Sequence, residues 1–339
     1  MVMRTFLAIC VLLVGLAANA QSDTADDDLA GARPSAGGEP DEITVRLGVL
    51  DIVEINDREQ LFVADLFVII EWQDPRLAVD DDTDTGSRIL PIDEIWNPRL
   101  TIVNNRGVDL LLPEVASVDR QGNVVVRQRL VGPLAVDLDL RDFPFDSQRL
   151  PVIFVSYEYS PSELVFSAAS SLVARFEDLG GEGWSYEAME PERSVYRLQE
   201  GGGGGSQISF AVLAERKAGY YVFTLALPMT LILFLAWMVH WLPVDVIPAR
   251  MGTASATVFS LIAFGVSFRL TLPKIAYLTD ADRFVLYSTL LVLVSLAVTV
   301  MTIRWASAER KDAAERLSGQ ARAAFPLLYA VIILLTVTT

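Results

Sequence analysis

Arg250 and Arg269 enclose an apolar segment whose composition is unusual for a helix that faces only lipid. No charged residue lies between them. Small or hydroxylated residues recur through the interval: Gly252, Thr253, Ala254, Ser255, Ala256, Thr257, Ser260, Ala263, Gly265 and Ser267. Water in a narrow path can solvate such hydroxyls, whereas lipid cannot. An arginine at each end with no acid between them indicates an aqueous path that favours anions.

A helix through residues 248–270, with about 3.6 residues per turn, would present one stripe of residues to that path. The stripe consists of Pro248, Gly252, Ala256, Phe259, Ala263, Val266 and Leu270. Phe259 and Val266 are the expected gate, because apolar rings close a narrow pore by dewetting. Ordinary packing between helices is the alternative role for both side chains.

The ends of this helix are expected to set the selectivity of the path. Pro248, Ala249 and Arg250 begin it without an acid, so the helix N-terminus keeps its partial positive charge unopposed. Arg269 adds positive charge at the other end. Two alternatives remain open. Both arginines can act as anchors at the membrane interfaces, and Asp245 can form a salt bridge with Arg250.

The rest of the chain predicts an exported membrane protein. Its 339 residues are 52% hydrophobic, and the mean hydropathy is +0.38. Residues 1–20 have a basic start, an apolar core and an Ala-Asn-Ala end, which is typical of a cleaved signal peptide. An uncleaved anchor is the alternative. Further apolar stretches predict membrane-spanning helices over residues 220–241, 248–270, 284–303 and 323–339.

The basic residues predict the orientation of these helices. The loop between the third and fourth spans carries Arg304, Arg310, Lys311, Arg316 and Arg322. Positive loops stay in the cytoplasm, so the C-terminus and the long segment before the first span are expected on the periplasmic or extracellular side. The pattern therefore predicts a protein of the plasma membrane whose chain crosses the bilayer several times.

Several classes of function have no support in the composition. The only cysteine, Cys10, lies in the expected signal peptide, so the mature chain has no disulfide. The net charge of −16 makes nucleic acid an unsuitable partner. His240, the only histidine, is expected as an interfacial anchor beside Trp237 and Trp241 and cannot form a metal site alone. No nucleophile–base pair and no cofactor motif is evident, so an enzyme is not expected.

Residues 21–219 read as a disordered leader followed by β structure. The leader, over residues 21–40, is rich in Asp, Gly, Ala and Pro. Short β-branched and aromatic runs separated by turn residues follow it and favour an Ig-like β-sandwich of about ten strands. In one run, Arg127 and Arg129 alternate with apolar residues and share a face. The glycine tract Gly201–Ser206 is expected to be a mobile hairpin tip, of natural or engineered origin.

Several motifs in order along the chain resemble the pentameric ligand-gated ion channels, the Cys-loop receptor superfamily. They are Trp72-Gln73-Asp74-Pro75-Arg76-Leu77, Trp96-Asn97-Pro98, Phe143-Pro144-Phe145-Asp146-Ser147-Gln148 and Glu215-Arg216-Lys217-Ala218-Gly219-Tyr220-Tyr221. The resemblance implies a β-sandwich ligand-binding domain over residues 41–218, a four-helix channel domain over residues 219–339, and a homopentamer around a central pore in the lipid bilayer.

One departure from the family is plain. Its signature cysteines would fall at Val136 and Leu150, which is similar to bacterial members, as is the absence of a folded insert between the last two spans. The run Pro248-Ala249-Arg250, with Arg269 before Leu272-Pro273-Lys274, is similar to the pore segment of glycine- and GABA-receptor-type chloride channels. A bacterial channel for chloride or other small anions is therefore expected.

The resemblance also implies which residues couple the two domains. They are Asp57, Phe143, Pro144, Asp146, Arg216, Leu272, Pro273 and Lys274. Asp57, Asp146 and Arg216 are expected to form a partly buried charge cluster, in which removal of one partner strands the others. Stabilisation of the domain junction alone is the alternative role for these charges.

The agonist site implied by the resemblance lies between subunits and is lined by aromatic residues. The matching positions are Phe67, Trp96, Tyr157, Glu158, Tyr159 and Tyr196. Aromatic faces attract ammonium groups, so an amine is a candidate ligand. The family's ligand-binding arginine aligns with Ile69, however, so the small-molecule agonist stays unknown. Tyr157 and Tyr159 can also be ordinary strand residues.

The leading hypothesis is a ligand-gated anion channel. A cation-conducting or proton-gated channel of the same family is the nearest alternative, because many carboxylates lie in the external domain. The alternative from another class is a membrane-tethered β-sandwich binding protein that conducts nothing.

Overall fold

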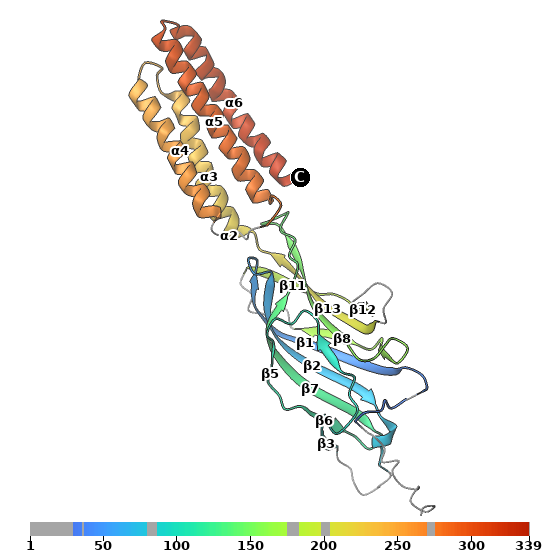
Figure 1. Cartoon of the computed structure of the whole chain (residues 1–339). Coiled ribbons are helices and arrows are strands. Elements are labelled where there is room, and N and C mark those ends of the chain that lie inside the picture. Colours follow the sequence, from blue (N-terminus) through green and yellow to red (C-terminus); the bar gives the residue numbers. More distant parts are fainter. Residues whose placement is uncertain are drawn as a thin grey trace, which may run out of the picture.

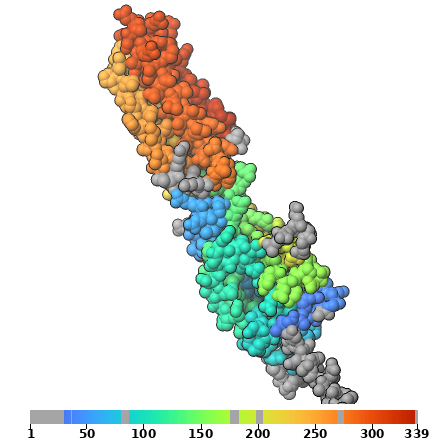
Figure 2. Space-filling view, in the orientation of Figure 1, coloured from blue at the N-terminus to red at the C-terminus, as the bar shows by residue number. Residues whose placement is uncertain are grey.

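The computed structural model describes residues 30–35, 37–79, 87–174, 183–197, 204–269 and 275–338. These residues form a β-sandwich and a helical bundle that are joined end to end in an elongated molecule (Figure 1, Figure 2). The expected signal peptide lies outside the described residues.

The β-sandwich consists of two sheets. One sheet runs in the order β10-β1-β2-β7-β6-β3, with β5 also paired to β7 and β9 to β1. The other runs β11-β13-β8-β4, with β12 also paired to β13. The strands are β1 (Asp41–Asn56), β2 (Leu61–Gln73), β3 (Arg88–Pro91), β4 (Leu100–Ile102), β5 (Asp109–Leu110), β6 (Val115–Val118), β7 (Asn123–Ala135), β8 (Ser147–Ser156), β9 (Leu164–Phe166), β10 (Ser171–Ala174), β11 (Trp184–Ala188), β12 (Glu192–Tyr196) and β13 (Gly205–Arg216).

Alternating burial explains why these segments form strands. On β2, Phe62, Ala64, Leu66 and Val68 are buried, while the residues between them are more exposed. This period of two places one face of the strand in the core between the sheets. The expected all-β sandwich is confirmed. The described strands exceed the expected ten because several are very short, such as β5.

Two expectations for the sandwich are wrong in part. The leader is not disordered up to residue 40, because the Arg33 guanidinium donates to Asp41 Oδ2 at 2.7 Å and to the Glu163 carbonyl at 2.6 Å. Within the expected glycine loop, Gly205 and Ser206 belong to β13. A Cβ on Gly205 would lie 2.1 Å from the Ser156 carbonyl oxygen, so this close approach requires glycine.

The bundle contains helices that are long and apolar enough to cross a membrane, over Gly219–Trp241, Ile247–Phe268, Asp280–Ser307 and Lys311–Thr336. The first is continuous through several elements. The elements are α2 (Gly219–Tyr221), η3 (Val222–Ala226), α3 (Leu227–Met238), η4 (Val239–Trp241), α4 (Ile247–Arg269), α5 (Asp280–Ser307) and α6 (Lys311–Thr338), and a short helix η1 (Pro75–Leu77) lies in the sandwich.

The third and fourth helices begin earlier than the sequence predicted. Thr279 caps α5 through a reciprocal capping box with Asp282, so α5 starts at Asp280 and not at Phe284. The helix α6 starts at Lys311 and not at Ala323, because its first turns consist largely of strong helix formers. The loop expected between these helices shrinks to residues 308–310.

The helices alternate in direction relative to the sandwich. The backbone N–H groups of Asp280 and Ala281 donate to the carbonyls of Arg141 and Phe143, so α5 begins at the sandwich. The C-terminus of α6 returns to the same end of the bundle (Figure 1). At the far end, Lys311 forms an ion pair with Asp245 at 2.9 Å. The suggested pairing of Asp245 with Arg250 is therefore wrong.

Candidate functional site

The stripe of α4 that the sequence assigned to an aqueous path is exposed in the single subunit. Phe259 is 72% exposed and Val266 is 58% exposed. The other described members of the stripe, Pro248, Gly252, Ala256 and Ala263, are exposed as well. A Cβ built on Gly252 would meet no atom within 4 Å. These residues are free to face a pore, a neighbouring subunit or lipid.

The opposite side of α4 packs on the rest of the bundle. Arg250, Ala254, Thr257 and Leu261 are buried, and they recur every three or four residues, as one face of a helix does. At about 100° per residue, this stripe is centred roughly opposite the exposed one. The subunit therefore turns the assigned face outward, away from its own helices.

Arg250 lies on the buried face, which corrects its expected role. Its side chain is fully buried, and its guanidinium donates to the Leu242 carbonyl at 3.0 Å and to the hydroxyls of Thr302 and Ser318 at 3.0 and 3.1 Å. It thus holds α4 to α5 and α6. A guanidinium held inside the bundle does not line the mouth of a path on the opposite face, nor does it anchor the helix at a membrane interface.

His240 is also buried, so the expectation of an interfacial anchor is wrong. Its Nε2 lies 2.9 Å from Ser295 Oγ. Because the Ser295 hydroxyl donates to the Ala236 carbonyl, the histidine Nε2 carries the hydrogen of this bond. The residue fixes the end of the first span against α5. No cluster of metal-binding side chains occurs among the described residues.

The other end of α4 is described only in part. Arg269 is the last residue of the helix. Leu270 and the expected coupling residues Leu272, Pro273 and Lys274 lie outside the described residues.

Arg216, at the end of β13, forms the centre of a charge cluster at the domain junction. Its Nε lies 2.8 Å from Asp146 Oδ1, and its Nη2 lies 3.1 Å from Asp146 Oδ2 and 3.0 Å from Asp57 Oδ1. The side chains of Arg216 and Asp146 are 3% and 1% exposed, whereas that of Asp57 is 20% exposed. The three charges that the sequence placed together therefore lie in direct contact, and the pair with Asp146 is the more buried.

Aromatic rings complete the surroundings of Arg216. Its Cζ lies 4.1 Å from the ring centre of Trp184, 4.9 Å from that of Phe143 and 5.5 Å from that of Tyr221. Burial alone lowers the pKa of Arg216, but the bonds to Asp146 and Asp57 outweigh it and raise the pKa above its ordinary value. The guanidinium stays charged and joins β13, the loop before β8 and the first helix.

Tyr277 makes a contact between the two domains that the sequence did not single out. The Tyr277 hydroxyl accepts a hydrogen bond from the Leu140 backbone N–H at 3.0 Å and lies 3.4 Å from the Leu138 carbonyl. This side chain joins the segment before α5 to the loop before β8. Sequence patterns gave no signal for it, since one tyrosine in a loop has many possible roles.

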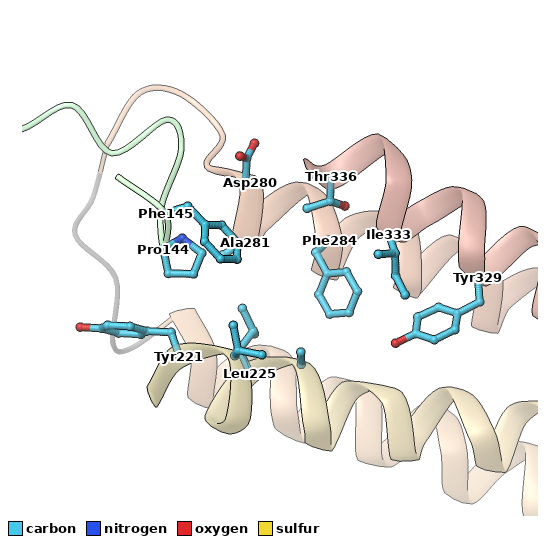
Figure 3. Close-up of a pocket in the computed structure, with 12 residues that line it drawn as sticks. Pro144, Phe145, Tyr221, Leu225, Asp280, Ala281, Phe284, Tyr329, Ile333 and Thr336 are labelled. Atoms are coloured by element: carbon cyan, nitrogen blue, oxygen red, sulfur yellow. The ribbon is translucent and has the colours of Figure 1, made fainter. Parts of the chain in front are cut away.

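A cavity of about 190 Å³ lies beside this junction. Pro144 and Phe145 of the loop face Tyr221 and Leu225 of the first helix, and the end of α6 closes the other side near Ile333 (Figure 3). The lining is almost wholly apolar.

One expected agonist residue cannot line a pocket directly. Trp96 is fully buried, and its Nε1 donates to the Tyr159 hydroxyl at 2.9 Å. Its ring packs edge-on against Trp72 at 5.9 Å between centres. Burial raises the pKa of the Tyr159 hydroxyl, which stays neutral and accepts this bond. Trp96 therefore supports the position of Tyr159 from inside the sandwich.

The other expected agonist residues lie on surfaces of the sandwich. Tyr157 is 66% exposed, and Glu158 beside it lies 3.5 Å from the Arg99 guanidinium. Phe67 on β2 and Tyr196 on β12 are half-buried. Phe67 lies on the outer face of its sheet, because its neighbours Leu66 and Val68 point into the core.

Comparison with known protein families agrees with this architecture. Residues 29–185 match the neurotransmitter-gated ion-channel ligand binding domain. Residues 225–330 match the neurotransmitter-gated ion-channel transmembrane region. The sandwich and the apolar helices are therefore the two parts of one receptor architecture, and the chain belongs to the Cys-loop superfamily of neurotransmitter-gated ion channels.

Proposed function

We propose that this ligand-gated channel is a homopentamer that conducts chloride or other small anions along an axis lined by α4. The observation that carries the proposal is the exposed stripe of α4, opposite the face that packs on the subunit's own helices. Lipid-facing helices have little use for glycine and alanine at three positions of one stripe, Gly252, Ala256 and Ala263. A narrow pore needs such small side chains, and Phe259 and Val266 supply its constrictions.

The absence of acids on the stripe and the positive charge at the ends of α4 support anion selectivity. Among the described residues of α4, the exposed face carries no acid, and Pro248 and Ala249 begin the helix where an acid would attract cations. Five helix N-termini would contribute partial positive charge at that mouth. Arg269 supplies charge at the other mouth. Arg250 contributes no ring of its own, since its side chain lies within the bundle.

The proposed orientation places the sandwich and the C-terminus outside a bacterial inner membrane. The end of the bundle far from the sandwich carries Arg310, Lys311 and Arg316, as the cytoplasmic side requires. The short α5–α6 connection fits a bacterial member. An external small molecule would bind between subunits, with Tyr157, Glu158, Tyr159 and Tyr196 on one face and Phe67 on the next subunit.

Opening would pass through the junction that Arg216 organises. Movement of the loop before β8 reaches the start of α5 through Tyr277, Asp280 and Ala281. The charge cluster links the same loop to β13 and the first helix.

The test is the reversal potential of the purified protein in planar bilayers under a chloride gradient. The proposal expects it to follow the chloride equilibrium potential. In a variant that combines deletion of Pro248 with Ala249→Glu, the reversal potential should move toward the equilibrium potential of the cation. A wild-type channel that follows the cation gradient would contradict anion selectivity. Absence of current with every ligand and pH tested would favour a non-conducting binding protein.

A further inference from the structure

The leader, which the sequence predicted to be disordered, carries a buried ion pair. Arg33 Nη1 lies 2.7 Å from Asp41 Oδ2, and the two side chains are 11% and 5% exposed. The Ser35 backbone N–H donates to the other carboxylate oxygen of Asp41 at 3.1 Å. Asp41 is the first residue of β1, so these bonds fold the leader back onto the sandwich.

The same guanidinium reaches a turn that lies far along the chain, before β9. Its Nη1 donates to the Glu163 carbonyl at 2.6 Å, and the Asp41 backbone N–H donates to that carbonyl at 2.8 Å. Arg33 therefore joins the leader, the start of β1 and this turn. A charge-assisted hydrogen bond is stronger than a neutral one, so the turn is held more firmly than backbone pairing alone would hold it.

The turn itself is closed by the Glu163 side chain. Its Oε2 accepts from the Ser160 backbone N–H at 3.0 Å and from the Ser160 hydroxyl at 2.7 Å. The bonds from Ser160, together with the charge of Arg33, lower the pKa of Glu163, so the carboxylate stays ionised and the turn stays closed at neutral pH.

This turn directly follows Tyr159, one of the expected agonist residues. The Tyr159 hydroxyl accepts a hydrogen bond from Trp96 Nε1 inside the sandwich, and its backbone continues into Ser160. Tyr159 is thus held at the hydroxyl by the core and at the backbone by the turn that Arg33 clamps.

From these contacts we infer that Arg33 is a positioning residue of the ligand-binding site and that residues 33–35 form a strap, which sets where the segment 157–159 lies. The inference rests on the proposed function, because that function places Tyr157, Glu158 and Tyr159 in the site between subunits. Arg33 acts on the site through Glu163 and Ser160 and not by contact with the ligand. Release of the strap should therefore displace one wall of the site without changing any residue of that wall.

The first test observes Tyr159 through its partner Trp96. Fluorine NMR is recorded on the full-length protein in detergent, with fluorinated tryptophan incorporated, and the Trp96 signal is assigned by its loss in Trp96→Phe. Arg33→Gln should shift or broaden this signal, because the tyrosine that accepts the indole bond moves. The signal of Trp184 at the domain junction should not change. Arg33→Lys keeps a positive charge opposite Asp41 and should restore most of the wild-type Trp96 signal.

The second test measures hydrogen exchange in the turn by mass spectrometry of the same proteins. The backbone N–H groups of Ser160, Glu163 and Leu164 are all hydrogen-bonded within the turn. Arg33→Gln should accelerate their exchange by ~10–100-fold, as expected from the loss of one charge-assisted bond. The matched control is Arg46→Gln, which removes a β1 arginine that pairs with Glu71 but is 48% exposed. It should change exchange in the turn by less than about twofold.

Each outcome decides the inference. It would be overturned by an unchanged Trp96 signal in Arg33→Gln, by failure of Arg33→Lys to restore that signal, or by accelerated exchange spread over the whole sandwich. Equal effects of Arg33→Gln and Arg46→Gln on the turn would also overturn it. Both measurements need neither agonist nor current. A local response in a protein that conducts no ions would therefore leave the positioning role intact and reject the proposed channel function.

Discussion

Removal of one charge at the domain junction should strongly destabilise the sandwich. Asp146 supplies two of the three carboxylate bonds to Arg216, and both side chains are almost fully buried. Loss of one partner of a buried pair costs about 3–5 kcal/mol. In Asp146→Asn, Arg216 keeps its bond to Asp57, so we expect a cost of ~3 kcal/mol.

The assay is thermal unfolding of the purified protein in detergent, followed by near-ultraviolet circular dichroism. For a domain of this size, a loss of ~3 kcal/mol lowers Tm by about 6–12 °C. Asp57 is more exposed and makes one bond, so Asp57→Asn should cost only ~1 kcal/mol. Glu192→Gln removes an exposed partner of Arg149 and should change Tm by less than about 2 °C.

The reasoning would be refuted by an Asp146→Asn protein that melts with the wild type. It would also be refuted by a Glu192→Gln protein that loses as much stability as Asp146→Asn. Either result would mean that burial of the Arg216 pair does not determine the strength of the junction.

Further predictions concern the pore, the core and the buried arginine. Phe259→Ala should give current without agonist in bilayers, because its apolar ring closes the pore; an unchanged closed state would move the gate elsewhere. Tyr159→Phe should cost about 1–3 kcal/mol in thermal unfolding, since Trp96 loses its acceptor. Tyr186→Phe should cost nothing at neutral pH, because that hydroxyl is buried without a partner among the described residues. Burial raises the pKa of Tyr186 to about 12. The wild type should therefore lose stability as pH rises from about 10 toward that value. Tyr186→Phe should reduce this loss, and Tyr159, whose pKa is also raised, should account for part of what remains. Arg250→Gln should lower Tm but leave the reversal potential unchanged; a shifted reversal potential would return Arg250 to the pore.

The helical segments were largely predictable from the sequence because length and hydropathy determine them locally. The position of Arg250 was predictable too. It shares a three- and four-residue repeat with Ala254, Thr257 and Leu261, which places it opposite Gly252 on any regular helix. The expectation failed because the arginine was interpreted by its distance from the end of the span and not by its angle around the axis.

Other features needed the folded chain. Whether Trp96 lines a surface or fills the core depends on how two sheets pack, and no local pattern encodes that. The contact between Arg33 and the Glu163 carbonyl depends on the pairing of β1 with β9, across a long stretch of sequence. The composition of the leader gives no signal of it, so only the folded chain reveals the strap.

The central claim is that the exposed stripe of α4 faces a water-filled axis. Its most direct test introduces single cysteines into a Cys10→Ala protein, which has no other thiol, and measures the block of current by a charged, membrane-impermeant thiol reagent. The account predicts block with cysteine at Gly252 or Ala256, and none at Ala254 or Thr257, which face the bundle interior. Block at the buried positions, or none at the exposed ones, would contradict it.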